Sequence, residues 1–262
     1  MPGPVNQTSP AGVDGGPALV GPAPEGPAAG GWLWQFGALL WPARCLACGE
    51  SGDGEHDLCR ACRRALPWNR SACSHCALPL PALPAADPVV CGRCLRRPPP
   101  LASVRSACLY AAPLDRLLPR FKFHGDLAAG RLLARLLAEA CASAPRPQAL
   151  LPVPLHRARL RSRGYDQALE LATPLARALD LDLHADLLLR TRATAAQSRL
   201  SAAARRRNVR DAFAVRPGLA LPAHVALVDD VMTTGATLHA AARALHRAGV
   251  QRVDAWVCAR VP

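Results

Sequence analysis

The chain has 262 residues and a formal net charge of +13, from 32 Lys and Arg residues against 19 Asp and Glu. This length allows one α/β domain plus a smaller module, and the 50% apolar content allows a sizeable core. The positive charge is consistent with a nucleic-acid or polyphosphate partner. It is equally consistent with a general Arg-, Ala- and Pro-rich composition that has no functional significance. No run of about 18 to 20 apolar residues occurs, so we predict no helical membrane span.

The first 31 residues are rich in Pro, Gly and Ala, lack periodicity and contain no Lys or Arg. We therefore predict a disordered tail at 1–31, no signal peptide and a cytoplasmic, reducing location. The stretch WLWQFGALLW, residues 32–41, predicts a short helix that packs on the next module, because it lacks the basic face of a membrane-surface helix. We expect this helix and a cysteine-rich module at 32–100, followed by an α/β domain at 101–262.

Eight of the eleven cysteines form four CxxC pairs between residues 45 and 94. Two such pairs can supply the four thiolates of a closed, tetrahedral zinc site. We predict two structural zinc sites, one held by Cys45, Cys48, Cys59 and Cys62 and one by Cys73, Cys76, Cys91 and Cys94. An interleaved pairing, and His75 in place of one cysteine, are alternatives. A redox dithiol or disulfides fit four pairs in a reducing compartment less well.

From about residue 103, strand and helix patterns alternate. Strands are predicted at VRSACLYAA (104–112), ALLPVP (149–154), VALVDD (225–230) and RVDAWVCARV (252–261). Helices are predicted over 114–142 with breaks near Pro119 and Gly125, over 164–180 with a kink at Pro174, and over 235–250 with Gly249 as the cap. This alternation favours an α/β fold with a parallel, doubly wound sheet.

The strand at 225–230 ends on two adjacent acids, Asp229 and Asp230. The turn that follows, residues 233–237, reads Thr-Thr-Gly-Ala-Thr and opens a helix, where free N–H groups and the helix dipole favour a phosphate. Ionised carboxylates only accept hydrogen bonds, so two of them suit the vicinal hydroxyls of a ribose 5-phosphate, and they can share a Mg2+ ion. The plain alternative is a solvated Asp-Asp turn before a capped helix.

This stretch resembles the phosphoribosyl-pyrophosphate (PRPP) motif of type I phosphoribosyltransferases. Together with the cysteine pairs, FKFHGD, LPVPLHRARLRSRGYDQA and RTRATAAQSRL…RRRNVRDAF, in that order, it resembles the ComF family of competence-associated proteins over residues 41–262. The resemblance implies a phosphoribosyltransferase-like sheet preceded by a double zinc ribbon, with PRPP and Mg2+ as ligands. It also implies a link to DNA uptake, with single-stranded DNA and a DNA-uptake helicase or another competence protein as partners.

The resemblance assigns roles to individual positions. The PRPP-binding positions that it implies are Val153, Pro154, Leu155, Arg192, Asp229, Asp230, Thr233, Thr234, Gly235, Ala236 and Thr237. The two acids would hold the ribose hydroxyls and be the catalytic residues, the turn would hold the 5′-phosphate, and the loop from Val153 the diphosphate. Arg192 would contact the diphosphate from a mobile, arginine-rich loop that closes over the ligand. Solvated arginines on a polar helix are the alternative.

A basic strip precedes Tyr165 and a helix, and it consists of His156, Arg157, Arg159, Arg161 and Arg163. It suits a diphosphate, or single-stranded nucleic acid with Tyr165 as a stacking surface, whereas Tyr165 in the core is the alternative. The only lysine, Lys122, is placed near the site by the resemblance alone.

Three functions remain open from the sequence. One is an enzyme that transfers ribose phosphate from PRPP to an acceptor nitrogen. The second is a non-catalytic protein that binds PRPP or single-stranded nucleic acid. The third is a protein that docks partners through its zinc module. The sequence contains the acidic pair, the phosphate turn and the basic loop expected of the PRPP-binding half of a transferase site. The expected acceptor region, about 180–190 and 211–222, shows no base-binding pattern.

Overall fold

The computed structural model describes residues 44–52, 57–82, 89–192 and 211–262. The predicted tail at 1–31, the predicted helix at 32–41 and the arginine-rich segment 193–210 lie outside the described residues. All described residues belong to one compact unit, which spans residues 42–262. Within them, no helix combines the length and the apolarity that a membrane crossing requires.

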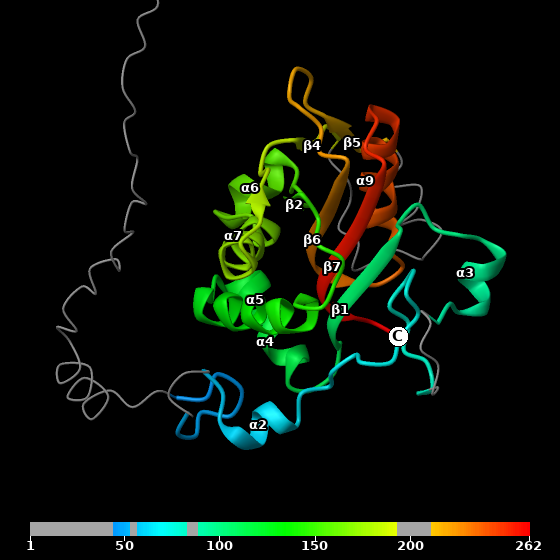
Figure 1. Ribbon diagram of the computed structural model, residues 1–262. Helices are drawn as coiled ribbons and strands as arrows, with labels where there is room; N and C mark the ends of the chain where they lie inside the picture. Colours follow the sequence, from blue (N-terminus) through cyan, green and yellow to red (C-terminus); the bar gives the residue numbers. More distant parts are fainter. Residues whose placement is uncertain (1–43, 53–56, 83–88, 193–210) are drawn as a thin grey trace, which may run out of the picture. The chain divides into compact units, whose positions relative to one another are not determined.

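The centre of this unit is a five-stranded parallel sheet with the strand order β1-β7-β6-β2-β3 (Figure 1). Its strands are β1 (Ser103–Leu109), β2 (Ala149–Pro152), β3 (Asp182–Leu183), β6 (His224–Met232) and β7 (Arg252–Arg260). The predicted parallel α/β sheet is therefore confirmed. Strand β6 ends two residues later than predicted, because Val231 and Met232 still pair with β7.

Helices cover both faces of the sheet, which explains why its central strands are apolar on both sides. Helices α4 (Leu114–His124), α5 (Leu127–Cys141) and α7 (Gln167–Leu179) cover one face, and α9 (Ala236–Ala248) covers the other (Figure 1). Side chains that alternate along a strand join different apolar clusters: Ala226 and Val228 pack with α4, α5 and α7, whereas Leu227 packs with α9.

Most helix boundaries coincide with glycine or aspartate capping residues, but one predicted helix break is absent. Gly125, with a φ of +66°, ends α4, and the Asp126 side chain caps α5 by accepting the Ala129 N–H. Gly249 ends α9 as predicted. The predicted break near Pro119 is wrong: α4 continues through it. The buried face of α4, which includes Phe121, packs on the sheet side and stabilises the helix despite the missing N–H.

Several short elements complete the described chain. The arginines of the predicted basic strip all lie in one short helix, α6 (Arg157–Arg163). Strands β4 (Leu188–Arg190) and β5 (Phe213–Val215) form a separate antiparallel pair. In the described residues of the cysteine-rich part, the helices are the short α2 (Arg60–Arg64) and α3 (Gly92–Arg96). Cys73, Cys76, Cys91 and Cys94 belong to one of the two apolar clusters that flank the sheet, and Cys45, Cys59 and Cys62 belong to the other.

Candidate functional site

The acidic pair lies at the carboxyl end of β6, between β7 and β2, where open parallel sheets bind ligands. Asp230 is 5% exposed, and its Oδ2 lies 2.6 Å from Nζ of Lys122 on α4. Asp229 is partly buried, and its Oδ1 accepts the Asp230 N–H over 2.9 Å. The chain's only lysine therefore neutralises part of the charge of this pair.

Two carboxyls this close cannot both ionise easily. Burial, and next the charge of Asp230, raise the pKa of Asp229 to about 7, against the opposite effect of Lys122. Burial lowers the pKa of Lys122, but its attraction to Asp230 and Asp229 outweighs burial, so the pKa is raised. The lysine is thus positively charged at neutral pH, while Asp229 is near its titration point.

The turn after β6 is shaped as an anion cradle. Gly235, with a φ of +74°, is the N-cap of α9, and Thr234 Oγ1 accepts the Ala236 N–H over 3.4 Å. A Cβ on Gly235 would lie 2.5 Å from Met232 Cε and 3.0 Å from His239 Nε2, so a side chain there would require both of these side chains to move. The first N–H groups of α9 have no helical partner, which is the arrangement that binds phosphate at helix starts.

The loop after β2 is held in place by Asp166, a residue that the sequence analysis did not select. Asp166 Oδ2 accepts the Leu155 N–H over 2.9 Å, while Oδ1 accepts from Ala168 and Leu169 as the cap of α7. At the start of the loop, the Val153 N–H donates to Val228 of β6 over 3.0 Å. The predicted diphosphate loop is therefore fixed at both ends, to β6 and to α7.

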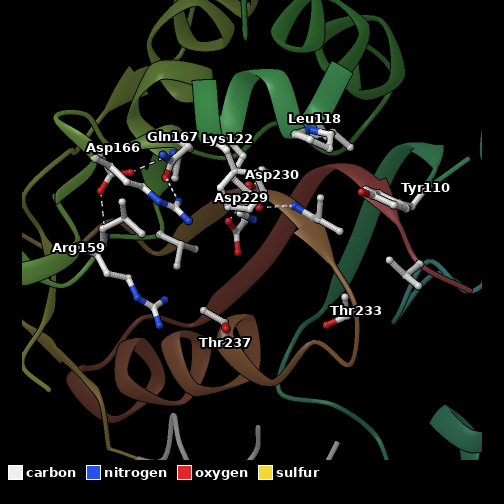
Figure 2. Close-up of a pocket in the computed structure, with 18 of the residues that line it drawn as sticks. Tyr110, Leu118, Lys122, Arg159, Asp166, Gln167, Asp229, Asp230, Thr233 and Thr237 are labelled. Carbon is white, nitrogen blue, oxygen red and sulfur yellow. Dashed lines mark hydrogen bonds and ion pairs between the residues drawn. The ribbon is translucent and has the colours of Figure 1, made fainter. Parts of the chain in front are cut away.

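These parts meet in one cavity of about 530 Å3 (Figure 2). The predicted residues that line it are Lys122, Val153, Leu155, Arg159, Arg163, Asp229, Asp230, Thr233 and Thr237. Lining residues that sequence reasoning missed include Tyr110, Phe123, Asp166, Gln167 and Arg190. In Figure 2, Arg159 and Thr237 point into the space below the acidic pair, and Lys122 lies above it.

The cavity contains an excess of cationic groups on the side of α6. Burial, and next the charge of Arg159, lower the pKa of Arg190, and burial together with Arg163 lowers the pKa of Arg159. These cations repel one another, so an anion bound among them would be stabilised. Two of them also lie over aromatic rings, Arg163 at 5.4 Å from the Phe123 centroid and Arg190 at 5.3 Å from that of Phe213.

Other predicted positions lie outside the cavity lining. They are Pro154, Arg157, Arg161, Tyr165, Arg192, Thr234, Gly235 and Ala236. Tyr165 donates its hydroxyl to the Phe121 carbonyl and packs near that ring, which matches the core alternative rather than a stacking surface. Arg157, Arg161 and Arg192 are exposed. The segment after Arg192, predicted to close over the ligand, is outside the described residues.

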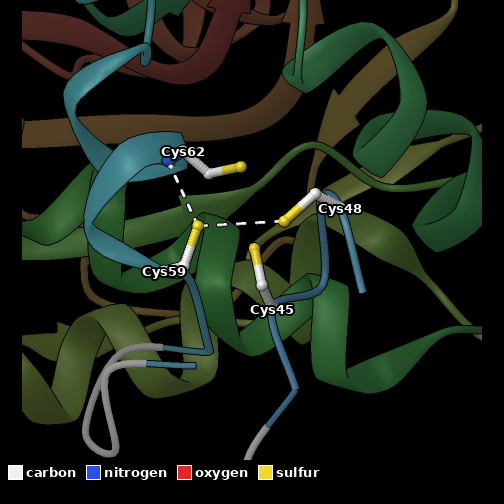
Figure 3. Close-up of side chains that lie close together, drawn as sticks. All are labelled: Cys45, Cys48, Cys59 and Cys62. Carbon is white, nitrogen blue, oxygen red and sulfur yellow. Dashed lines mark hydrogen bonds between the residues drawn. The ribbon is translucent and has the colours of Figure 1, made fainter. Parts of the chain in front are cut away.

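The cysteines gather into the two predicted groups of four, in sequence order rather than interleaved. In each group the four sulfurs lie within 4.8 Å of one another. Figure 3 shows the first group, in which the sulfurs of Cys48 and Cys59 are 3.8 Å apart. In the second group the sulfurs of Cys76 and Cys91 are also 3.8 Å apart. Zn–S bonds of about 2.3 Å in a tetrahedron place sulfurs about 3.8 Å apart, so both groups fit zinc. His75 contacts the Leu101 carbonyl instead and does not complete either group.

The thiols within each cysteine group differ in acidity. Burial and neighbouring thiols raise the pKa of Cys62 and of Cys94. Despite burial, backbone hydrogen bonds help to lower the pKa of Cys45 to about 6 and of Cys91 to about 7, so a bound cation would favour the thiolate form of all four thiols in each group. Backbone N–H groups point at the sulfurs: Cys62 N–H donates to Cys59 Sγ, and Cys91 N–H to Cys73 Sγ. Such donors stabilise metal-bound thiolates.

Comparisons with known proteins match the cysteine-rich part and the carboxyl-terminal part of the chain to two different domain families. A model of the double zinc ribbon domain matches residues 36–95, and a model of the phosphoribosyl transferase domain matches residues 166–262. The chain is 36% identical over 232 residues to DNA utilization protein YhgH of Escherichia coli O157:H7, covering 85% of this chain and 96% of that protein. It is 36% identical over 226 residues to Competence protein F of Haemophilus influenzae, covering 83% and 96% of the two chains.

Proposed function

The chain belongs to the ComF family, which unites DNA utilization protein YhgH and Competence protein F, and we propose that it binds PRPP together with Mg2+ in the cavity at the end of β6. One observation carries this proposal. Asp229 and Asp230, the Thr233 and Thr237 side chains and the cation Arg159 line a single cavity. Vicinal hydroxyl donors next to phosphate groups match this combination of acceptors and cations.

Each part of the cavity has a task in this proposal. The carboxylates of Asp229 and Asp230 accept hydrogen bonds from the ribose hydroxyls. The turn at 233–237 and the start of α9 bind the 5′-phosphate, while Arg159 and the loop at Val153 bind the diphosphate. Bound Mg2+ would neutralise diphosphate charge and would be held by oxygen ligands such as these carboxylates.

Binding in this way is linked to a proton. Since the pKa of Asp229 is about 7, part of the protein carries a proton there at neutral pH. Ribose hydroxyls and a cation favour the ionised carboxylate, so ligand binding should release that proton. Affinity for PRPP with Mg2+ should therefore increase as the pH rises from about 6 to 8.

Transfer of the ribosyl group is a second step beyond donor binding. Negative charge from Asp229 and Asp230 beside the anomeric carbon would stabilise the oxocarbenium-like charge that develops as diphosphate leaves. The acceptor would be a nitrogen nucleophile. Release of pyrophosphate in the presence of candidate bases measures this activity separately from binding.

The deciding experiment is calorimetric titration of zinc-loaded protein with PRPP and Mg2+. The native chain is compared with Asp229→Ala/Asp230→Ala and with the control Asp182→Ala, which removes an exposed acid of β3. We expect binding by the native chain and the control, and none by the double variant. Absence of binding to folded native protein would reject the proposal, and unchanged binding by the double variant would reject this site.

A second candidate function is binding of single-stranded nucleic acid, and the exposed arginines of α6 favour it. Arg157 and Arg161 are exposed and do not line the cavity, so they are accessible to phosphates of a larger ligand. The names of the relatives, DNA utilization protein and Competence protein, point in the same direction. A DNA-uptake helicase or another competence protein as the partner of the zinc ribbons stays a hypothesis from the same resemblance.

Anisotropy of a labelled single-stranded oligonucleotide, measured over a range of salt concentrations, tests this candidate. Each lost phosphate contact should reduce the slope of log affinity against log salt by about 0.7. Arg157→Gln/Arg161→Gln should therefore reduce the slope by about 1.4 and leave PRPP binding unchanged. An unchanged slope would exclude these two arginines as phosphate contacts.

A further inference from the structure

Arg260, the last residue of β7, is a buried cation without a carboxylate partner among the described residues. It is 3% exposed, and the ion pairs in the described part of the chain do not include it. Its Nε donates to the Cys76 carbonyl over 2.9 Å, and its Nη1 donates to the Met232 carbonyl over 3.2 Å and to the Val261 carbonyl. A buried guanidinium in such a place requires negative charge nearby.

The second cysteine group supplies that charge. Arg260 Nε is hydrogen-bonded to the backbone of Cys76, which is one of the four cysteines of that group. A zinc ion with four thiolates has a net charge of about −2, because four anionic ligands outweigh the charge of the ion. Arg260 is therefore placed as the counter-cation of this zinc site, and it contacts the site directly through the Cys76 carbonyl.

The other end of the guanidinium fixes the start of the phosphate-binding turn. Met232 is the last residue of β6 and immediately precedes Thr233. Its carbonyl accepts the Arg260 side chain and also the Val261 N–H, over 3.0 Å. The turn packs on the Met232 side chain, since a Cβ on Gly235 would lie 2.5 Å from its Cε. Met232 thus connects Arg260 to the geometry of the turn.

We propose that Arg260 is a positioning residue that couples zinc binding by Cys73, Cys76, Cys91 and Cys94 to anion binding by the turn at 233–237. Zinc bound by the four sulfurs would hold the Cys76 backbone in place, Arg260 bridges the Cys76 carbonyl to the Met232 carbonyl, and Met232 packs against the turn. The identity of the anion, PRPP, rests on the proposed function. The coupling itself concerns only the turn and the zinc site.

The first cysteine group lacks this connection. Cys45, Cys59 and Cys62 pack in the apolar cluster on the other face of the sheet, and the neighbouring Leu46 carbonyl accepts a hydrogen bond from Arg120 of α4. The second group, in contrast, shares its apolar cluster with Met232 and α9. Zinc at the two sites should therefore differ in its effect on the turn.

Coupling of two sites is reciprocal, so it can be tested without a variant. Zinc affinity of the native full-length chain is measured by competition with a zinc-selective dye, with and without PRPP and Mg2+. We expect two transitions, of which the one assigned to the second group shifts to at least about fivefold higher zinc affinity with ligand. Variants with Cys45→Ser or Cys73→Ser assign the transitions. Ligand that binds and leaves both zinc affinities unchanged would overturn the proposal.

The variants Arg260→Met and Arg260→Lys test the residue itself. The control is Arg252→Met, at the opposite end of the same strand, which removes an ion pair with buried Asp254. With zinc content verified, Arg260→Met should reduce PRPP affinity by about tenfold and abolish the ligand effect on zinc affinity. Arg260→Lys, which keeps the charge, should recover part of the affinity, and the control should retain both properties.

Amide hydrogen exchange separates this proposal from the proposed function. Residues 232–238 should exchange faster in Arg260→Met than in native protein or in the Arg252→Met control, in the absence of any ligand. If native protein fails to bind PRPP, the proposed function fails, and this exchange difference alone decides the coupling. Equal exchange in folded, zinc-loaded Arg260→Met and native protein would overturn it.

Discussion

Replacing Asp229 by Asn should stabilise the folded protein above about pH 7 and at the same time weaken PRPP binding. In the folded chain, burial and Asp230 raise the pKa of Asp229 from 3.8 to about 7, so ionisation of this carboxyl opposes folding. The Asn side chain removes the charge and keeps an oxygen for the Asp230 N–H. The ion pair between Lys122 and Asp230 is left in place.

The size of the gain follows from the pKa difference between the folded and unfolded chains. A shift of about three units corresponds to about 4 kcal/mol of unfolding free energy, which is an upper limit. Asp229 is only partly buried and faces the cavity, so water screens part of the effect, and we expect about 1 to 3 kcal/mol. Because the folded pKa is raised, the gain should be complete above about pH 7, decrease at lower pH and vanish below about pH 4.

Urea denaturation of the zinc-loaded native and Asp229→Asn proteins between pH 5 and pH 8 measures this profile. PRPP titrations on the same samples provide the binding side. Asp182→Asn, an exposed acid in β3, is the control that should change neither quantity. A gain that does not depend on pH, or a loss of stability at pH 8, would refute the electrostatic reasoning.

Two further predictions concern the turn and the metals. Gly235→Ala should reduce ribose 5-phosphate affinity by about tenfold in a titration, because its Cβ would displace the side chains of Met232 and His239, which pack against the turn. Gly218→Ala has a similar φ, +79°, with open space around its Cβ, and should leave the affinity unchanged. Zinc chelation should increase amide exchange in 45–52 and 57–82 more than in β6, because those segments lack a core of their own. Equal exchange with and without zinc would contradict a structural role.

The sequence predicts those parts of the molecule that depend on short spacing. The CxxC pairs predict the two cysteine groups, and the order strand, acids, threonine turn and helix is present in β6 and α9. Contacts between distant residues were not predictable. Lys122 and Asp230 are 108 positions apart, and two of the partners of Arg260, Cys76 and Met232, are brought together only by the fold.

Asp166 was missed for a different reason. Its position before a helical pattern marks it as a helix cap, and it does cap α7 through Oδ1. Its second oxygen is free for another donor, and nothing in a single sequence identifies that donor as the Leu155 N–H. One carboxylate with two acceptor oxygens can thus serve the fold and the site together. Pattern analysis recognises only the first of these roles.

The distribution of charge separates the two candidate ligands in space. Inside the cavity, Asp229 and Asp230 repel a ligand that offers only phosphates, whereas a ribose phosphate also offers hydroxyl donors to them. On the outside of α6, Arg157 and Arg161 have no acid within ion-pair distance among the described residues, so a nucleic-acid backbone meets only attraction there. PRPP and single-stranded nucleic acid should therefore be able to bind the same protein molecule simultaneously. If PRPP with Mg2+ displaced a bound oligonucleotide at constant ionic strength, both would use the cavity, and this division of the surface would be wrong.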